Sequence, residues 1–362
     1  MEAIKAIMEN YVKYGVVKKA IYDNLSIYNY TTETQFKGDW NYYSKMARGL
    51  ILDEEGTIVA RPMPKFFNLN EIDESAISNL PNEIPEVSTK LDGSMIISYF
   101  HKDKLRFATR GSFDSDQAKW AMELFNKKYS HVNFDKYRDF TFCFEAIYTL
   151  NRIVVDYGEL EDLFLLAVIH KEGGWDYTYN DVRKIADELG LKSVFSELKS
   201  FDEMYADLKK NPINFEGYVL RYSNGLRVKC KTEEYCRLHR LMTGISEKAI
   251  WEVLKNKDDL TKFLDRVPDE FHRWFDTTRN TIQHNYENIE QKAKLIFNDT
   301  PKFDTRKEYA LSFKEKADSS LMGILFSMLD NQDYSEIIWK MVKPKTGQTF
   351  RILKEDESIL GK

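Results

Sequence analysis

The 362-residue sequence has little cysteine and no long hydrophobic run. Its three cysteines, Cys143, Cys230 and Cys236, lack the spacing of a disulfide framework, and the last two have no Cys or His partners for a structural zinc ion. No stretch reaches the roughly 18 apolar residues of a membrane-spanning helix. The N-terminal segment mixes both charges and lacks the continuous apolar core of a signal peptide. These absences predict a reduced, cytoplasmic protein that is not held in a membrane.

The sequence also lacks an excess of positive charge and the common nucleotide-binding loops. Its formal net charge is −5, so any contact with nucleic acid must come from a local basic surface. Residues 221–240 are such a region, with six Arg or Lys residues and two Glu residues. No GxxxxGK[ST], GxGxxG, GxSxG or HExxH motif is present. A nucleotide would therefore have to bind without a Walker-type phosphate loop.

Hydrophobic periodicity predicts two regions of different architecture. Up to about residue 240 we expect three β-hairpins, over 48–62, 94–111 and 215–231, and two further strands, over 139–148 and 162–170. We also expect three helices in this part of the chain, over 2–14, 114–129 and 180–190. Beyond residue 232 every segment has a helical pattern, notably 268–297, 304–318, 320–330 and 333–342. The prediction is an α+β domain with antiparallel sheets over 1–240, followed by an all-helical domain over 241–362.

The stretch STKLDGSMIISYF at 88–100 places charged residues and a glycine directly before a strand-like run. An uncharged lysine amine is a nucleophile, and nearby cations or desolvation lower its pKa toward neutrality. Gly93 would let the backbone pass close to a ligand. Lys90 is therefore a candidate nucleophile, and the alternative is a solvated lysine in an ordinary turn.

The segment RVKCK at 227–231 predicts a row of positive charge on a strand. Side chains alternate between the two faces of a strand, so Arg227, Lys229 and Lys231 share one face. Three aligned cations repel each other unless an anion lies over them, and a triphosphate would serve. The alternative is a solvated edge strand that uses lysines against aggregation.

Two strands carry an isolated carboxylate. In FTFCFEAIY the phenylalanines share one face, so Glu145 points to the other face, and Glu216 precedes a glycine in FEGYVLRY. Two strand carboxylates suit Mg²⁺, which prefers one or two carboxylates together with waters and phosphates. The alternative is an exposed sheet face. Arg48 and Lys65, the latter beside two phenylalanines, would each be ordinary surface cations if taken alone.

Taken together, these motifs resemble the covalent nucleotidyltransferases, the superfamily of ligases and RNA capping enzymes. Within it the sequence is similar to the RNA ligase 1 family, the ATP-dependent phage type that repairs broken tRNA, because of the KFFN stretch and the spacing from Glu145 to NRIV. The resemblance covers residues 26–240. In chain order its motifs are Arg48-Gly49, Lys65-Phe66-Phe67-Asn68, Lys90-Leu91-Asp92-Gly93-Ser94, Thr109-Arg110-Gly111-Ser112, Phe144-Glu145, Asn151-Arg152-Ile153-Val154, Glu216-Gly217-Tyr218-Val219 and Val228-Lys229-Cys230-Lys231.

The resemblance implies a three-step reaction of the RNA ligase (ATP) type. Lys90 attacks the α-phosphate of ATP and pyrophosphate leaves; the AMP moves to a 5′-phosphate on RNA; a 3′-hydroxyl then attacks and AMP leaves. It also implies the remaining roles. Glu145 would hold the ribose or a metal-bound water, and Glu216 would hold the metal and its waters. Lys229 and Lys231 would bind the α-phosphate, and Arg48 and Lys65 would bind the pyrophosphate end. Phe67 and Gly93 would contact the nucleotide.

Two positions are less well matched by the family pattern. Arg110 stands where the family usually has lysine, which keeps the charge but changes its geometry. Asp258 or Asp259 would help to hold a second metal ion, Mg²⁺ or Mn²⁺.

The implied partners are RNA, in particular tRNA with a broken anticodon loop that the helical domain would recognise, and an end-healing kinase-phosphatase. The expected protein is a monomer of the cytoplasm, or of the host cytoplasm if a phage encodes it. Three alternatives stay open: a DNA ligase or GTP-dependent capping enzyme, an inactive nucleic-acid-binding module with the same fold, and a structural helical protein with an unrelated α+β half.

Overall fold

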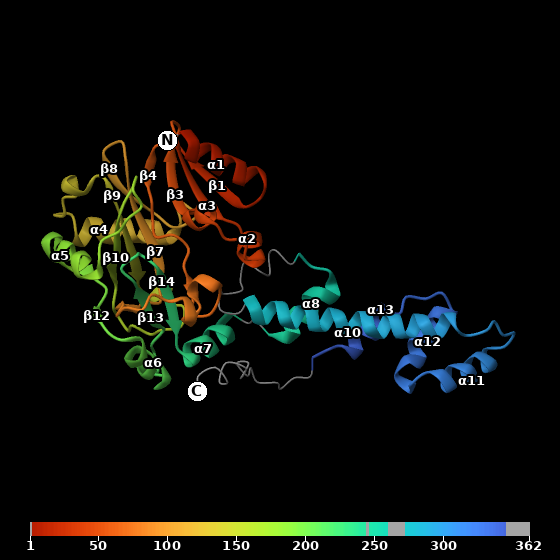
Figure 1. Ribbon diagram of the computed structural model, residues 1–362. Helices are drawn as coiled ribbons and strands as arrows, with labels where there is room; N and C mark the ends of the chain where they lie inside the picture. The colour runs from red at the N-terminus through yellow and green to blue at the C-terminus, as the bar shows by residue number, and fades with distance from the viewer. Residues whose placement is uncertain (1, 244–245, 260–271, 345–362) are drawn as a thin grey trace. The chain divides into compact units, whose positions relative to one another are not determined.

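The computed structural model describes residues 2–243, 246–259 and 272–344, and the chain divides into two compact units, Met1–Thr243 and Gly244–Lys362 (Figure 1). The predicted roles of the two domains, catalysis and RNA recognition, stay predictions. Among the described residues no helix combines the length and the apolar character that crossing a membrane requires.

The first unit begins with a small helix-covered sheet. Helix α1 (Glu2–Lys13) packs its apolar face on a four-stranded antiparallel sheet, with Met8 fully buried. The strands follow chain order: β1 (Val17–Tyr22), β2 (Leu25–Tyr30), β3 (Arg48–Asp53) and β4 (Ile58–Ala60). Two short helices, α2 (Thr32–Lys37) and α3 (Tyr42–Met46), lie between β2 and β3. The pattern of the sequence predicted α1 and the β3–β4 hairpin but not the β1–β2 hairpin.

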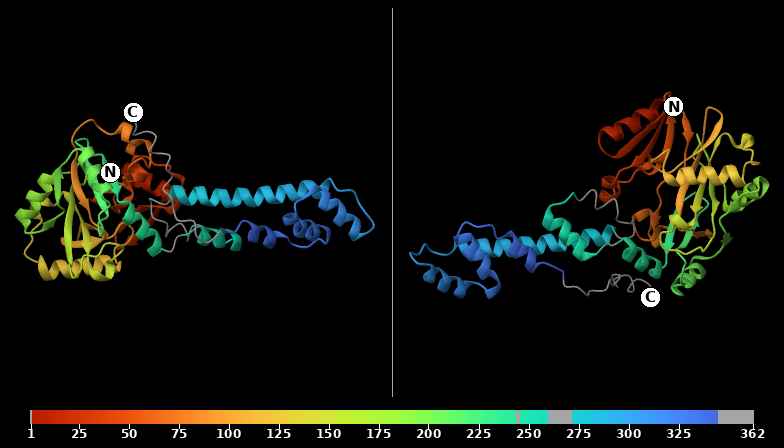
Figure 2. Two further views of the ribbon diagram at one scale, coloured as in Figure 1. Left: turned by 90° about the horizontal axis from the view of Figure 1, so that it is seen from below. Right: turned by 180° about the vertical axis from the view of Figure 1, so that it is seen from behind.

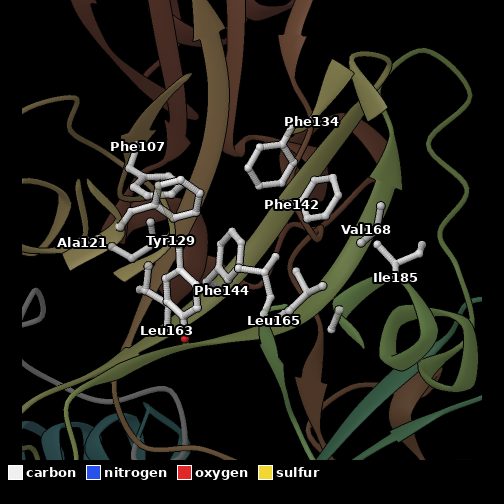
Figure 3. Packing of buried hydrophobic residues seen from close by; sticks show 14 of the residues in the cluster. Phe107, Ala121, Tyr129, Phe134, Phe142, Phe144, Leu163, Leu165, Val168 and Ile185 are labelled. Atoms are coloured by element: carbon white, nitrogen blue, oxygen red, sulfur yellow. The ribbon is translucent and has the colours of Figure 1, made fainter. Parts of the chain in front are cut away.

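A five-stranded sheet forms the centre of the first unit, in the order β11-β10-β9-β7-β8. Its strands are β7 (Ser94–His101), β8 (Lys104–Ala108), β9 (Phe140–Ile147), β10 (Asp162–His170) and β11 (Lys192–Ser193). Helices α4 (Asp116–Lys128) and α5 (Tyr179–Leu189) contribute to the aromatic-rich cluster on one face, where Phe142 and Phe144 point in the same direction (Figure 3).

The opposite face of β9 is also buried. Cys143 has no exposed surface and packs with Met63, Ala167 and Ile169. The alternative interpretation of Glu145, that it points to an exposed sheet face, is therefore wrong. The strand carries its carboxylate into the interior of the unit.

A second five-stranded sheet carries four of the predicted site residues, Phe67, Lys90, Lys229 and Lys231. Its order is β12-β6-β13-β14-β5, from the strands β12 (Ser196–Leu198), β6 (Glu86–Lys90), β13 (Gly217–Arg221), β14 (Arg227–Lys231) and β5 (Phe67–Asn68). Helix α6 (Phe201–Lys209) packs on the face that includes Val228 and Cys230. The alternation predicted for β14 is confirmed, because its apolar residues join this core while its cations point to the other face.

The second unit is helical throughout its described residues (Figure 2). It comprises α8 (Glu247–Asn256), α10 (His272–Asn298), α11 (Arg306–Lys316), α12 (Met322–Leu329) and α13 (Ser335–Met341). Its core includes Ala293, Phe313, Ile324, Leu325 and Ile338, so the long α10 is the element on which the shorter helices pack. Helix α7 (Glu233–Thr243) follows β14 directly and ends the first unit. The α+β fold class with a helical C-terminal region is confirmed.

Candidate active site

Strand pairing places Lys90 beside the lysine-rich strand. Lys90 is the last residue of β6, opposite Gly217 of β13, and Gly217 is in turn opposite Lys231 of β14. A Cβ atom at Gly217, where φ is +148°, would lie 2.0 Å from the carbonyl oxygen of Cys230, so a side chain does not fit between the two lysines. The register therefore brings the strands of Lys90 and Lys231 close together on either side of Gly217.

The carboxylate of Glu216 forms ion pairs with both lysines. Its Oε1 lies 2.8 Å from Nζ of Lys90 and 3.2 Å from Nζ of Lys231. The Glu216 side chain is only 2% exposed, whereas that of Lys90 is 21% exposed. The second oxygen, Oε2, is buried and has no hydrogen-bond partner among the described residues. The cluster thus has a fixed anion at its base and an amine that solvent and ligands can reach.

The turn that follows Lys90 is fixed by Asp92. Its Oδ2 accepts the backbone N–H groups of Val154 and Val155, each at 2.8 Å, and its Oδ1 accepts the hydroxyl of Tyr235 at 2.8 Å. Asp92 is only 4% exposed, so these bonds are buried and costly to break. Asp92 therefore positions the backbone next to Lys90, and its own side chain is taken up by these bonds.

Gly93 is needed for packing. A Cβ atom there would lie 2.4 Å from the carbonyl oxygen of Ala146 and 2.8 Å from Cδ1 of Ile147. The sequence interpretation gave a different reason, access of a ligand to the backbone. The N–H of Gly93 donates to Oε1 of Glu145 at 3.1 Å, so the same close approach ties the turn to the predicted carboxylate.

The carboxyl group of Glu145 has a raised pKa. It lies on β9 opposite Met95 of β7 and is half-buried. Burial raises the pKa of Glu145 to about 7, against the opposing charge of Lys90, and the negative charge of Glu216 adds to the increase. The carboxyl group therefore holds its proton to a higher pH than an exposed glutamic acid does.

Arg48 and Lys229 lie against one aromatic ring. Nζ of Lys229 is 5.6 Å from the centroid of the Phe66 ring, and the guanidinium carbon of Arg48 is 5.7 Å from it. Lys229 is 9% exposed, and a guanidinium nitrogen of Arg48 donates to the carbonyl oxygen of Met63 at 3.4 Å. The structure therefore brings together two cations that the resemblance assigns to different phosphates.

Lys65, Phe67 and Arg110 form a neighbouring cluster around Tyr30. Nζ of Lys65 lies 5.6 Å from the Tyr30 ring and 5.4 Å from the Phe67 ring. A guanidinium nitrogen of Arg110 donates to the Tyr30 hydroxyl at 3.0 Å. Phe67 pairs with Val228 of β14, which sets this cluster beside the lysine strand.

Arg227 does not take part in the lysine cluster. It pairs with Asp176, which also accepts Arg221 at 3.1 Å, and Arg221 reaches Glu86 at 3.0 Å. Burial alone would raise the pKa of Asp176, but the charges of Arg227 and Arg221 hold it below its ordinary range. The prediction that one anionic ligand covers all three cations of RVKCK is therefore wrong for Arg227, because the protein supplies its counter-ion.

The predicted metal ligands fall into two groups. Glu145 and Glu216 are close enough for the charge of one to raise the pKa of the other, and the unpaired Oε2 of Glu216 fits a cation or its water. Asp258 and Asp259 lie in the second unit after α8, and both are exposed. Within the described ranges no group of three or more His, Cys, Asp or Glu side chains is arranged as a metal cage.

The pattern of the sequence did not predict the roles of four residues at the site. Asp92 and Tyr235 bond to each other across the site, and Tyr30 and Trp40 flank Lys65. Asp92 belongs to the KLDGS motif, but its role depends on two amides more than sixty positions away. The other three are single aromatic residues in a chain with 14% aromatics, so only the fold identifies them.

Comparison with known proteins points to one family. A family model described as RNA ligase, of the T4 ligase 1 type, matches residues 46–235, which include every predicted site residue except Asp258 and Asp259. A candidate RNA ligase of Thermovibrio ammonificans is 26% identical over 205 residues, 54% of this chain. The chain matches about half, 53%, of that relative's length.

The solved structures that match this chain include two ligases. A candidate ATP-dependent DNA ligase from Aquifex aeolicus has a TM-score of 0.47 and 14% identity, covering 91% of this chain and 99% of the other. An archaeal ATP-dependent RNA ligase has a TM-score of 0.48 and 13% identity, covering 91% of this chain and 96% of the other.

Proposed function

Because this chain belongs to the RNA ligase family, we propose that it joins RNA ends in an ATP-dependent reaction that passes through an adenylate on Lys90. The observation that carries the proposal is the row formed by Lys90, Gly217 and Lys231, with Glu216 bridging the two amines. The row places a reachable amine next to a second cation, and one carboxylate holds both amines. An α-phosphate beside Lys90 would meet both the nucleophile and a charge that stabilises it.

In the first step Nζ of Lys90, after losing a proton, attacks the α-phosphorus of ATP. A P–N bond forms, the bond between the α-phosphorus and its bridging oxygen breaks, and pyrophosphate leaves. Lys231 and Lys229 offset the negative charge that builds on the α-phosphate oxygens. Arg48, Lys65 and Arg110 face the leaving pyrophosphate.

In the later steps the adenylate passes to the RNA. The 5′-phosphate of one RNA end displaces Lys90 from the adenylate, and the 3′-hydroxyl of the other end then displaces AMP. Glu145, with a pKa of about 7, is suited to hold a ribose hydroxyl and to accept its hydrogen bond. The final displacement is easier than direct joining because AMP is a good leaving group.

A divalent cation, Mg²⁺ or Mn²⁺, would be held by Glu216 and Glu145 together with phosphate oxygens. When bound, it would neutralise phosphate charge at the α-position. The support within the structure is the buried Oε2 of Glu216, which has no hydrogen-bond partner among the described residues. Asp258 and Asp259 carry no comparable support, because both are exposed and no third ligand group accompanies them in the described part of their unit.

The helical second unit is proposed to recognise RNA, with a tRNA broken in its anticodon loop as the substrate and an end-healing kinase-phosphatase as the partner that prepares the ends. Its support is indirect. The family match ends at residue 235, so the helices add nothing to the reaction motifs.

Two assays test the function. Incubation with α-labelled ATP and Mg²⁺ should give a labelled protein band on a denaturing gel, whereas α-labelled GTP should not. The protein should then seal a tRNA nicked in its anticodon loop faster than a nicked DNA duplex. Labelling by GTP would indicate a capping-type enzyme, and preference for the DNA duplex would indicate a DNA ligase.

A further inference from the structure

Lys65 is a charged residue enclosed by aromatic rings. It is 4% exposed, and its Nζ lies 5.6 Å from the centroid of Tyr30, 5.5 Å from that of Trp40 and 5.4 Å from that of Phe67. An ammonium group over a ring face is attracted by the negative charge of the ring, most strongly for tryptophan. Three rings at nearly equal distances form a cage that favours the charged amine and limits its movement.

The cage is itself rigid because its rings contact each other edge to face. Trp40 is centred 5.0 Å from Tyr30 at 89°, and 5.5 Å from Phe67 at 67°. This is the preferred geometry of aromatic pairs. Trp40 therefore contacts both other walls of the cage as well as the cation.

The backbone on either side of Trp40 is held by two helix caps. Gly38 ends α2 in the left-handed conformation, with φ at +69°, and its carbonyl accepts the N–H of Trp40 at 2.9 Å. Asn41 then begins α3, and its side chain and that of Ser44 form a reciprocal capping box. Only three residues separate the last residue of α2 from the capping residue of α3, so the Trp40 side chain has little freedom to leave the cage.

The same cage connects two cations. The ring of Tyr30 faces Lys65, its hydroxyl accepts a guanidinium nitrogen of Arg110 at 3.0 Å, and the guanidinium carbon lies 5.7 Å from its centroid. Lys65 and Arg110 are thus set on one aromatic support, which fixes their separation. Two fixed cations suit a ligand with two linked anionic groups, such as the β- and γ-phosphates of ATP.

We propose that Trp40 is a positioning residue for ATP: with Tyr30 and Phe67 it holds Lys65 so that this lysine and Arg110 together bind the pyrophosphate part of the nucleotide. The inference rests on the proposed function, because it concerns the same nucleotide site. Trp40 acts through Lys65 and makes no contact with the reacting atoms. Its loss should therefore weaken the binding of the triphosphate while leaving the chemistry at Lys90 in place.

The test is the effect of Trp40→Leu on lysine adenylylation. The KM for ATP should rise roughly tenfold while kcat falls less than threefold, as expected for a cation–π contribution in a desolvated site. The loss should be at least fivefold greater for adenylylation than for sealing RNA that is already adenylylated, which carries no triphosphate. Trp40→Phe keeps a ring and should recover most of the affinity.

Two controls separate the electrostatic role from simple packing. Tetrafluorotryptophan at position 40 keeps the shape of the ring but removes most of its negative potential, so the KM for ATP should still rise several-fold. Tyr14→Leu removes a ring from another lysine pair, in which Nζ of Lys13 lies 5.8 Å from an exposed tyrosine, and should change nothing. Thermal unfolding checks that each variant is folded.

The outcomes are distinct. If wild-type protein gains no AMP, the proposed function is wrong and this inference falls with it. If wild-type protein is adenylylated but Trp40→Leu has an unchanged KM for ATP, or tetrafluorotryptophan behaves as tryptophan does, only the inference is wrong. A rise in KM that follows the loss of ring potential would support the cage.

Discussion

Two clusters of charge lie on one face of the sheet β12-β6-β13-β14-β5, and they differ in how far solvent and ligands can reach their charges. At one end Glu86 and Asp176 pair with Arg221 and Arg227, two acids with two bases, which we call the balanced cluster. At the other end Lys90 and Lys231 both pair with the carboxylate of Glu216. Residues four positions apart on the strands β6, β13 and β14 build the two ends.

The difference indicates what each cluster does. The balanced cluster is closed: Arg221 and Arg227 are each 6% exposed, and their counter-ions come from the protein. The lysine cluster is open: the Lys90 side chain is 21% exposed, and the buried Oε2 of Glu216 has no hydrogen-bond partner in the part of the chain that the structure describes. Closed, buried ion pairs hold strands together, whereas a reachable amine beside an unsatisfied carboxylate is suited to binding a ligand.

The largest effect on stability is expected from Asp176→Asn. The change leaves Arg221 and Arg227 buried with less compensation and should lower the free energy of unfolding by about 3 to 5 kcal/mol. Chemical denaturation measures this change, and Asp103→Asn, at a side chain that is 99% exposed, is the matched control. Folded Asp176→Asn protein should keep the wild-type KM for ATP. A large rise in that KM would mean that the balanced cluster belongs to the nucleotide site.

The low pKa of Asp176 adds a pH dependence to the same comparison. A carboxyl group with a lowered pKa contributes stability that is present above its unfolded pKa and is lost as the pH falls through its folded pKa. As the pH falls from 5 to below the folded pKa of Asp176, the free energy of unfolding should therefore fall more for wild-type protein than for Asp176→Asn protein. Parallel losses in the two proteins would contradict the ion network.

The second effect is on activity and comes from Glu216→Gln. Removing the shared charge disturbs Lys90 and Lys231 together and should slow lysine adenylylation by about 100-fold. Stability should fall less than in Asp176→Asn, because the Lys90 amine can turn to solvent. Single-turnover labelling with ATP measures the rate. Glu197→Gln, which alters an ion pair with Lys199 on the edge strand, should leave it unchanged.

The smallest effect is a pH-dependent one at Glu145. Its folded pKa, about 7, is raised above the unfolded value, so ionising it costs stability as the pH rises from about 4.5 through 7. Glu145→Gln removes this cost, so between pH 5 and pH 8 the variant should gain roughly 1 to 2 kcal/mol relative to wild type, allowing for solvent screening. Unfolding curves at both pH values measure the difference, and a constant difference would contradict the raised pKa.

The sequence allowed the architecture and most of the candidate site to be predicted, because both depend on local pattern. Alternation placed Lys229 and Lys231 on one face and Cys230 in the core, and periodicity located α10 within a few residues. The β1–β2 hairpin was missed because Val17–Tyr22 has two consecutive lysines and leaves Ile21 exposed, so its apolar and polar residues do not alternate.

What the sequence did not reveal depends on contacts between distant segments. The counter-ion of Arg227 comes from Asp176, in a loop that no spacing rule connects to β14. Gly93 is required by a carbonyl oxygen on β9, and the rings around Lys65 come from three separate segments. Such relations follow from the packing of two sheets and cannot be read from local periodicity.

Peptide mapping after incubation with ATP and Mg²⁺ tests the central claim most directly, namely that the lysine cluster captures a nucleotide on its reachable amine, Lys90. The account predicts one peptide, the one containing Lys90, with the added mass of AMP bound through an acid-labile P–N bond, and no such peptide from Lys90→Arg protein. An unmodified Lys90, or AMP attached to Lys229 or Lys231 instead, would contradict it.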